Sequence, residues 1–132
     1  MNVKTDTKEK FHAITVNDPV LSATMTDEMG ECLLPYLQNE VKNLVLILKN
    51  VTELDTVAAE KLVYIQQKFY ENSASFVICQ LQQGVEDFLD NNNLLELMNV
   101  TPTESEAWDI VQMEEIEREL LDSDDVEFEQ NN

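Results

Sequence analysis

The side chains best suited to chemistry in this chain are few, and they stand far apart. The sequence contains one histidine, His12, and two cysteines, Cys32 and Cys79. General acid–base and nucleophilic catalysis both need two reactive groups within hydrogen-bond reach of each other. Nothing in the spacing pairs His12 with a second reactive group, so we predict no catalytic residues and a protein that is not an enzyme.

The sequence also lacks the known motifs that bind metal ions or phosphate groups. No Cys-x-x-Cys pair is present, and a structural zinc site needs clustered cysteines or histidines. Gly30 and Gly84 are the only glycines, too few and too separate for a phosphate-binding loop. The acidic run over 122–125 lacks the glycine turn and distal glutamate of a calcium loop. We therefore predict no metal and no cofactor, and we interpret Cys79, inside an apolar run, as a buried and inert thiol.

The strongly negative net charge of the chain limits the kinds of molecule that it can bind. The formal net charge is −19, from 27 acidic and 8 basic residues, and residues 104–132 alone hold 12 of the acids and one base, Arg118. Such a field repels phosphate backbones and anionic lipids, so we predict no nucleic-acid binding and no direct membrane insertion. The same field favours association with basic surfaces of other proteins.

Nothing in the sequence indicates export or a membrane span. The first ten residues are polar, unlike a signal peptide. The longest apolar run covers only residues 44–48, far below the length of a transmembrane helix. We expect a cytoplasmic protein.

Short apolar runs alternate with segments of helical periodicity, and these elements must position any site. We predict strands over 11–16, 20–23, 41–48, 75–81 and 98–100, and helices over 24–37, 57–71, from 85 to about 91, and 103–121. Pro35 predicts a kink or early end in the first helix. Strands alternating with helices indicate an α/β fold with a mixed, mostly parallel sheet and four helices. The crossover rule places 41–48 beside 75–81 as parallel neighbours.

The chain length corresponds to one domain. We expect a flexible N-terminus over residues 1–10, a folded domain over 11–121 and an acidic disordered tail over 122–132. The residues expected to be mostly buried are Leu46, Leu48, Leu62, Ile65, Phe69, Val77 and Phe88.

Asp55 and Thr56 stand where the helix over 57–71 begins. The simplest role for an oxygen at this position is capping, in which it accepts hydrogen bonds from the free N–H groups of the first turn. Thr56 also carries a hydroxyl that could accept a phosphate, although the neighbouring Asp55 would repel it.

Three stretches, taken in order, resemble one known family. Residues 44–58 combine a hydrophobic strand with a polar turn and an Asp-Thr-Val-Ala helix start. Residues 76–95 combine a strand, a short helix and a leucine-containing loop, and residues 101–107 form a Pro-Thr turn into a Glu-Ala helix. This arrangement resembles the STAS family, the sulfate transporter and anti-sigma factor antagonist domain, over about residues 11–121.

The resemblance implies a protein-binding domain with an altered switch. Domains of that family bind kinase-type anti-sigma factors, or form part of signalling assemblies and transporters. Phosphorylation of a Ser or Thr in an Asp-Ser-Ser/Thr-Gly motif stops binding. Here Asp55 and Thr56 match the first two positions, but Val57 stands at the phosphoacceptor position and Ala58 at the glycine. Valine has no hydroxyl, so the resemblance implies a degenerate switch, with Thr56 as a weak alternative acceptor.

The resemblance also implies where a partner would bind. The expected rim around the helix start consists of Asn50, Thr52, Asp55, Thr56, Val57, Lys61 and Tyr64. Tyr64 lies off the apolar face of its helix, so it is either an exposed anchor or a cover for the helix edge.

Two functions remain open from the sequence. One is a regulatory domain that resembles anti-sigma factor antagonists, with an anti-sigma factor or serine kinase as its partner. The other is an accessory subunit of a larger assembly, such as a phospholipid-transport ATPase or a stressosome-like complex. The sequence does not set the oligomeric state.

Overall fold

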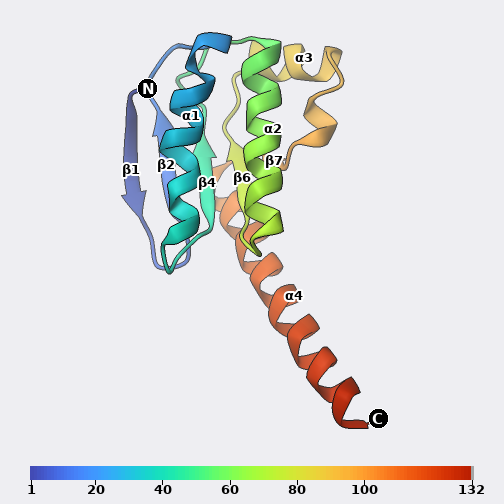
Figure 1. The fold of residues 1–132 in the computed structure, drawn as a ribbon. Helices are drawn as coiled ribbons and strands as arrows, with labels where there is room; N and C mark the ends of the chain where they lie inside the picture. The colour runs from blue at the N-terminus through green and yellow to red at the C-terminus, as the bar shows by residue number, and fades with distance from the viewer. Residues whose placement is uncertain (132) are drawn as a thin grey trace.

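A five-stranded sheet in the order β1-β2-β4-β6-β7 forms the centre of the domain in this computed structural model (Figure 1). Its strands are β1 (Val3–Thr7), β2 (His12–Val16), β4 (Leu44–Ile47), β6 (Phe76–Cys79) and β7 (Val100–Thr101). β1 runs antiparallel to β2, and the other neighbouring pairs are parallel. The structure describes residues 1–131, with the backbone alone over 122–131. The predicted mixed, mostly parallel sheet is confirmed, as is the parallel pairing of β4 with β6.

Four α-helices surround this sheet, as predicted. They are α1 (Thr26–Leu33), α2 (Thr56–Glu71), α3 (Gln83–Asn91) and α4 (Glu104–Asn131). α1 and α2 lie side by side on one face of the sheet, and α4 crosses the other face (Figure 1). α3 lies near the beginning of α2, at the opposite end of the domain from the point where α4 leaves it (Figure 1).

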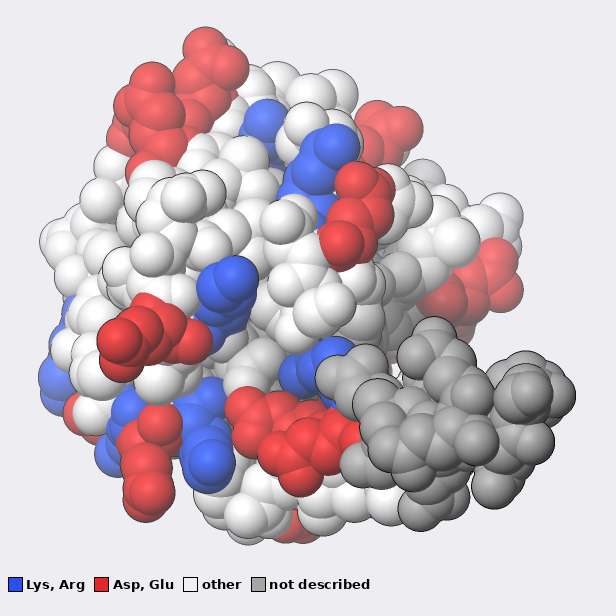
Figure 2. All heavy atoms as spheres, turned by 60° about the horizontal axis from the view of Figure 1, so that its bottom comes forward, with Lys and Arg blue, Asp and Glu red and all other residues white. Residues whose placement is uncertain are grey.

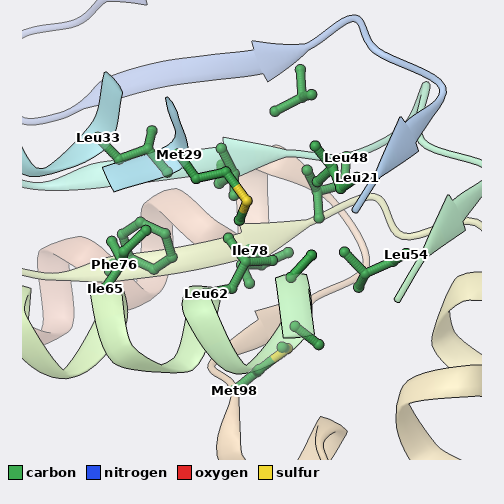
Figure 3. Close-up of a cluster of buried hydrophobic side chains, with 14 of the residues drawn as sticks. Leu21, Met29, Leu33, Leu48, Leu54, Leu62, Ile65, Phe76, Ile78 and Met98 are labelled. Atoms are coloured by element: carbon green, nitrogen blue, oxygen red, sulfur yellow. The ribbon is translucent and has the colours of Figure 1, made fainter. Parts of the chain in front are cut away.

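The strands β4 and β6 are buried on both faces, which explains why they are continuously apolar. Alternate residues of each strand point to opposite sides. Leu46 and Ile78 join the larger cluster under α1 and α2, whereas Val45 and Val77 join the smaller cluster under α4. Figure 3 shows side chains of the larger cluster, contributed by both helices and the strands.

Six of the seven residues predicted for the core are fully buried: Leu46, Leu48, Leu62, Ile65, Phe69 and Val77. Phe88 is partly buried and packs against the larger cluster from its edge. The short helix α3 buries Val85 and Leu89, one turn apart on the same side. Phe88 lies at the edge of that buried face and lines an open groove instead.

Residues 1–10, expected to be a flexible N-terminus, contain β1, which forms the outer strand of the sheet. Val3 pairs with Val16 and Thr7 pairs with His12 in one continuous antiparallel ladder. Four of the five side chains of β1 are exposed. A polar sequence is compatible with an edge strand because backbone hydrogen bonds, and not apolar side chains, hold it in place.

The last helix includes most of the segment over 122–132 that was expected to be an acidic disordered tail. The backbone of α4 remains helical to Asn131, while residue 132 lies outside the described residues. The segment over 122–131 contains no glycine or proline that would stop a helix.

The segment between β4 and α2 contains a short strand that was not predicted. β5 (Glu53–Leu54) pairs in parallel with β3 (Val20–Leu21) in a separate two-stranded sheet. α1 ends at Leu33 and gives way to a 3-10 turn over Leu34–Gln38, which agrees with the early end predicted from Pro35. The small β3–β5 sheet brings its polar loops to the beginning of α2.

Candidate partner-binding site at the start of α2

Asp55 is the N-cap of α2, and both oxygens of its carboxylate are in use. Oδ1 accepts a hydrogen bond from the Ala58 N–H at 2.8 Å, within the first turn of the helix. Oδ2 accepts from the Ala23 N–H at 2.8 Å, where the turn leading into α1 begins. The capping role is confirmed, and Asp55 also links the starts of α1 and α2. The Asp55 carboxylate therefore fixes the start of α2 relative to the turn before α1.

An open groove of about 580 Å³ lies beside this cap. Its walls come from the β3–β5 sheet, the beginning of α2 and the beginning of α3. The lining residues are Val20, Leu21, Ser22, Thr52, Glu53, Leu54, Asp55, Thr56, Gly84, Val85 and Phe88. A Cβ added at Gly84 would meet no atom within 4 Å, so the groove is wide at that point. Its floor is apolar and its rim carries hydroxyls and carboxylates.

The structure brings three of the predicted rim residues directly to this groove: Thr52, Asp55 and Thr56. The Thr52 hydroxyl donates to the Pro19 carbonyl at 3.0 Å, which fixes the loop before β5. Thr56 is exposed and occupies the first position of α2. Val57 follows on the first turn with 49% of its surface exposed, beside the groove but outside its lining.

The other three predicted rim residues lie outside the groove lining. Asn50 is exposed, and its amide donates to the Asn17 side chain at 3.3 Å. The Lys61 ammonium lies 4.9 Å from the centre of the Tyr64 ring, which is a cation–π contact. Lys61 also lies against Gly30 of α1, where a side chain would crowd it.

Tyr64 forms part of a second, smaller hollow on the outer side of α2. Tyr64 is 44% exposed, and the Lys68 ammonium, one turn further along the helix, lies 5.4 Å from the centre of its ring. The hollow also contains Leu94 and the half-exposed Leu97 from the segment after α3. Sequence reasoning did not assign Val20, Phe88 or Leu97 to the surface, because each reaches it through tertiary packing.

His12 is a structural residue, not a reactive one. Its ring is buried, with Nε2 2.9 Å from the Val41 carbonyl and Nδ1 3.2 Å from the Thr7 hydroxyl. A carbonyl only accepts, so Nε2 carries the proton and Nδ1 accepts from Thr7. Both ring nitrogens are occupied in joining β1, β2 and the segment before β4.

The two cysteines are poor nucleophiles. Burial raises the pKa of the Cys79 thiol to about 12, and the nearby Glu104 carboxylate acts in the same direction. Burial also raises the pKa of Cys32. Both side chains therefore remain protonated near neutral pH, and the thiolate is the reactive form.

The part of the chain described by the structure contains no group of three histidine, cysteine or acidic side chains placed to hold a metal ion. Over the same residues, no helix combines the length and the apolar character that crossing a membrane requires.

The fold is that of several solved proteins. TM1081 from Thermotoga maritima, a candidate anti-sigma factor antagonist, superimposes with a TM-score of 0.72 at 17% identity, over 83% of this chain and 94% of that one. An anti-sigma factor antagonist from Mycobacterium paratuberculosis gives 0.71 at 14% identity, over 84% and 93%. The murine anion transporter Slc26a9 gives 0.65 at 12% identity, over 79% of this chain but 18% of the transporter.

The sequence itself matches one family. No curated protein sequence matches this chain. A family model, however, described as the STAS domain, matches residues 2–107, which is most of the chain and includes β1. It covers the cap at Asp55, the groove beside it and the beginning of α4. This chain belongs to the STAS domain family.

Proposed function

We propose that this chain is a non-enzymatic regulatory domain that binds a protein partner, in the manner of an anti-sigma factor antagonist. The partner surface is the rim formed by Asn50, Thr52, Asp55, Thr56, Val57, Lys61 and Tyr64. An anti-sigma factor or a serine kinase is the partner that the likeness to anti-sigma factor antagonists supports.

The exposed side chain of Val57 carries this proposal. A valine with 49% of its surface in solvent, beside a groove floored by Leu21 and Leu54, leaves apolar surface exposed at one place. The two side chains that hold the helix start and the loop, Asp55 and Thr52, are fixed by hydrogen bonds. A rigid polar rim around apolar surface is the usual anatomy of a protein interface.

We propose further that phosphorylation does not control this surface at the usual position. Val57 cannot accept a phosphate. A phosphate on Thr56 would stand next to the Asp55 carboxylate, and that carboxylate already accepts from two N–H groups at this helix start. Repulsion between the two anions would oppose the modification.

A role as an accessory subunit of a larger assembly is the second candidate. The observation in its favour is the structural likeness to the Slc26a9 transporter, in which the matching region is 18% of a longer chain. The same rim would then contact another component of the assembly.

Photo-crosslinking tests the location of the surface. A photoreactive amino acid at Val57 is expected to crosslink one partner in extract from the source cells, and one at Tyr64 is expected to capture the same protein. The matched control is the exposed Glu71 at the far end of α2, where no crosslink to that partner is expected. Equal capture from position 71, or no capture from position 57, would reject this rim as the partner surface.

Incubation with an anti-sigma kinase and ATP tests the switch. The wild-type protein is expected to gain no phosphate by intact-mass spectrometry. Val57→Ser is expected to become a substrate, with Ala58 retained because its side chain is buried under the cap. Phosphate on wild-type Thr56 would show that the switch has moved by one residue.

A further inference from the structure

The outer part of α4 carries more exposed apolar surface than any other helix in the described part of the chain. Among the described residues, eight large apolar side chains are exposed, and four of them lie in one nine-residue stretch of α4: Met113, Ile116, Leu120 and Leu121. Each of the four is between 56% and 62% exposed. Single exposed apolar residues need no explanation, but a cluster on one element indicates a contact surface.

Three of these side chains form one stripe that faces away from the domain. An α-helix turns once every 3.6 residues, so Met113, Ile116 and Leu120 share one face. Ala107 and Val111 lie on the opposite face, and both are fully buried against the sheet. We name the three exposed residues the outer stripe. Leu121 lies to the side of it.

Polar contacts hold α4 in this orientation. The Arg118 guanidinium donates to the Ser75 hydroxyl at 3.2 Å and to the Asn43 side-chain oxygen at 3.3 Å. The Tyr70 hydroxyl donates to the Glu114 carboxylate at 2.8 Å. These contacts come from the same side of the helix as Val111, so the outer stripe is left without a partner from the domain. Beyond them, the helix continues away from the body (Figure 1).

On α4 itself, the charged side chains beside the outer stripe are acidic. From the body of the domain, Lys10 and Lys42 approach only Glu119, with which they line a hollow. Glu106 and Asp109 precede it on the same face, and Glu117 and Glu119 flank it, all four of them exposed. The single cation of α4, Arg118, is occupied on the opposite side. Figure 2 shows the end of the molecule from which α4 emerges, where the other cations are mixed with acidic side chains.

This charge distinguishes between possible occupants. Two copies of the chain packed through the outer stripe would bring both sets of acids together, which disfavours a dimer. A helix with apolar residues at matching spacing and Lys or Arg on its flanks would instead pair each acid with a base.

We infer that the outer stripe of α4 is a docking site for a basic amphipathic helix of a partner protein. The apolar residues of that helix pack on Met113, Ile116 and Leu120, and its lysines or arginines face Glu117, Glu119 and Asp109. α4 leaves the domain at the end opposite to the beginning of α2 (Figure 1), so a partner at the start of α2 and one on the outer stripe can be bound together. The inference does not depend on the function of the rim around α2.

A synthetic peptide provides the probe. It has about 20 residues, enough for a stable helix, with leucines at i, i+3 and i+7 spacing and lysines on both flanks. A scrambled peptide of the same composition is the control. It has the same charge but no apolar face, so it shows how much binding comes from charge attraction alone. Binding is followed on the full chain by the ε-methyl NMR signal of Met113, while the buried Met29 serves as the internal reference.

The patterned peptide is expected to shift the Met113 signal and the scrambled peptide to leave it unchanged. Ile116→Gln combined with Leu120→Gln is expected to raise the Kd about 10-fold or more. Leu121→Gln, the matched control beside the outer stripe, is expected to change the Kd less than about threefold. Glu117→Lys with Glu119→Lys keeps the outer stripe but is expected to weaken binding as well. All of these positions are exposed, and circular dichroism checks that the fold is retained.

Three outcomes would overturn the inference. The first is equal binding of the two peptides, which would leave only charge attraction. The second is unchanged binding by the Ile116→Gln, Leu120→Gln variant. The third is a wild-type dimer in sedimentation that the same variant dissociates, because a second copy would then be the occupant of the outer stripe.

Discussion

The two faces of the sheet are covered in different ways. On the side of α1 and α2, 22 buried residues form one cluster, and α2 alone contributes five of them. On the side of α4, the cluster has eight buried residues. Among the described side chains of α4, over 104–121, only Ala107 and Val111 belong to this cluster, whereas the 16-residue α2 contributes five residues to the other. The face under α4 therefore has the smaller core, and most of the described side chains of α4 lie outside it.

We call the side of the sheet covered by α1 and α2 the thick face and the side covered by α4 the thin face. Truncation of a buried side chain on the thick face is expected to cause the largest loss of stability. Phe69 is fully buried, and its ring lies 5.1 Å from that of Phe76. Phe69→Ala removes this contact and leaves a cavity, so the free energy of unfolding should fall by about 3–5 kcal/mol. Urea denaturation followed by circular dichroism measures the change. The exposed Val57→Ala serves as control, and a loss below 1 kcal/mol for Phe69→Ala would contradict the thick-face assignment.

The thin face is expected to tolerate truncation better. Val111 is also fully buried, but it packs in the eight-residue cluster. Val111→Ala should lower the free energy of unfolding by about 1–2 kcal/mol, chiefly through the lost apolar burial. The single tryptophan, Trp108, packs against this cluster and reports on it by fluorescence. If Val111→Ala cost as much as Phe69→Ala, the two faces would be equivalent in energy.

One side chain connects the helices of the two faces. The Tyr70 hydroxyl, at the end of α2, donates to Glu114 of α4 and accepts from the Asn99 amide at 2.8 Å. Tyr70→Phe should lower the free energy of unfolding by about 0.5–1.5 kcal/mol. Urea denaturation at neutral pH measures it, and no loss would mean that the two faces are independent.

The same contact gives a dependence on pH. Burial raises the pKa of Tyr70 above its ordinary value of 10.0, and the hydrogen bond to Glu114 acts in the same direction. Above about pH 10 the unfolded chain releases this proton while the folded chain keeps it, so stability falls as the pH rises. The advantage of the wild type over Tyr70→Phe should therefore shrink between about pH 9 and pH 11. A constant difference would contradict this.

The outer stripe of α4 is expected to show the smallest effect. Ile116 is 56% exposed and has no partner in the described part of the domain, so Ile116→Gln should change the free energy of unfolding by less than about 0.5 kcal/mol. The same denaturation experiment tests this. A larger loss would show that Ile116 belongs to the core of the thin face.

The sequence predicted correctly the strands and helices that show a clear apolar periodicity. The apolar runs of β4 and β6 and the spacing of Leu62, Ile65 and Phe69 in α2 need no tertiary information. β1 was not predicted because four of its five side chains are exposed. β5 was not predicted because it has only two residues and pairs with β3, which is distant in the sequence. Such a pairing leaves no apolar pattern in the segment itself.

One part of the candidate site could be predicted from the sequence and another part could not. The capping role of Asp55 could be predicted because a cap and its helix are adjacent in the sequence. The groove could not, since its walls come from β3, β5 and α3, and only the fold brings Val20 and Phe88 together. The outer stripe was missed because apolar residues of α4 indicate burial until the sheet is seen to occupy the opposite face.

The outer strand β1 has a consequence for how the protein behaves at high concentration. Lys4 and Asp6 put charged side chains along the exposed margin of the sheet, where bare backbone would otherwise recruit strands from other molecules. β2, the next strand, is almost completely buried and would make an apolar, uncharged margin. β1 thus acts as a protective border against aggregation. A chain shortened by its first eight residues should be prone to form intermolecular β-structure even where its helices still fold.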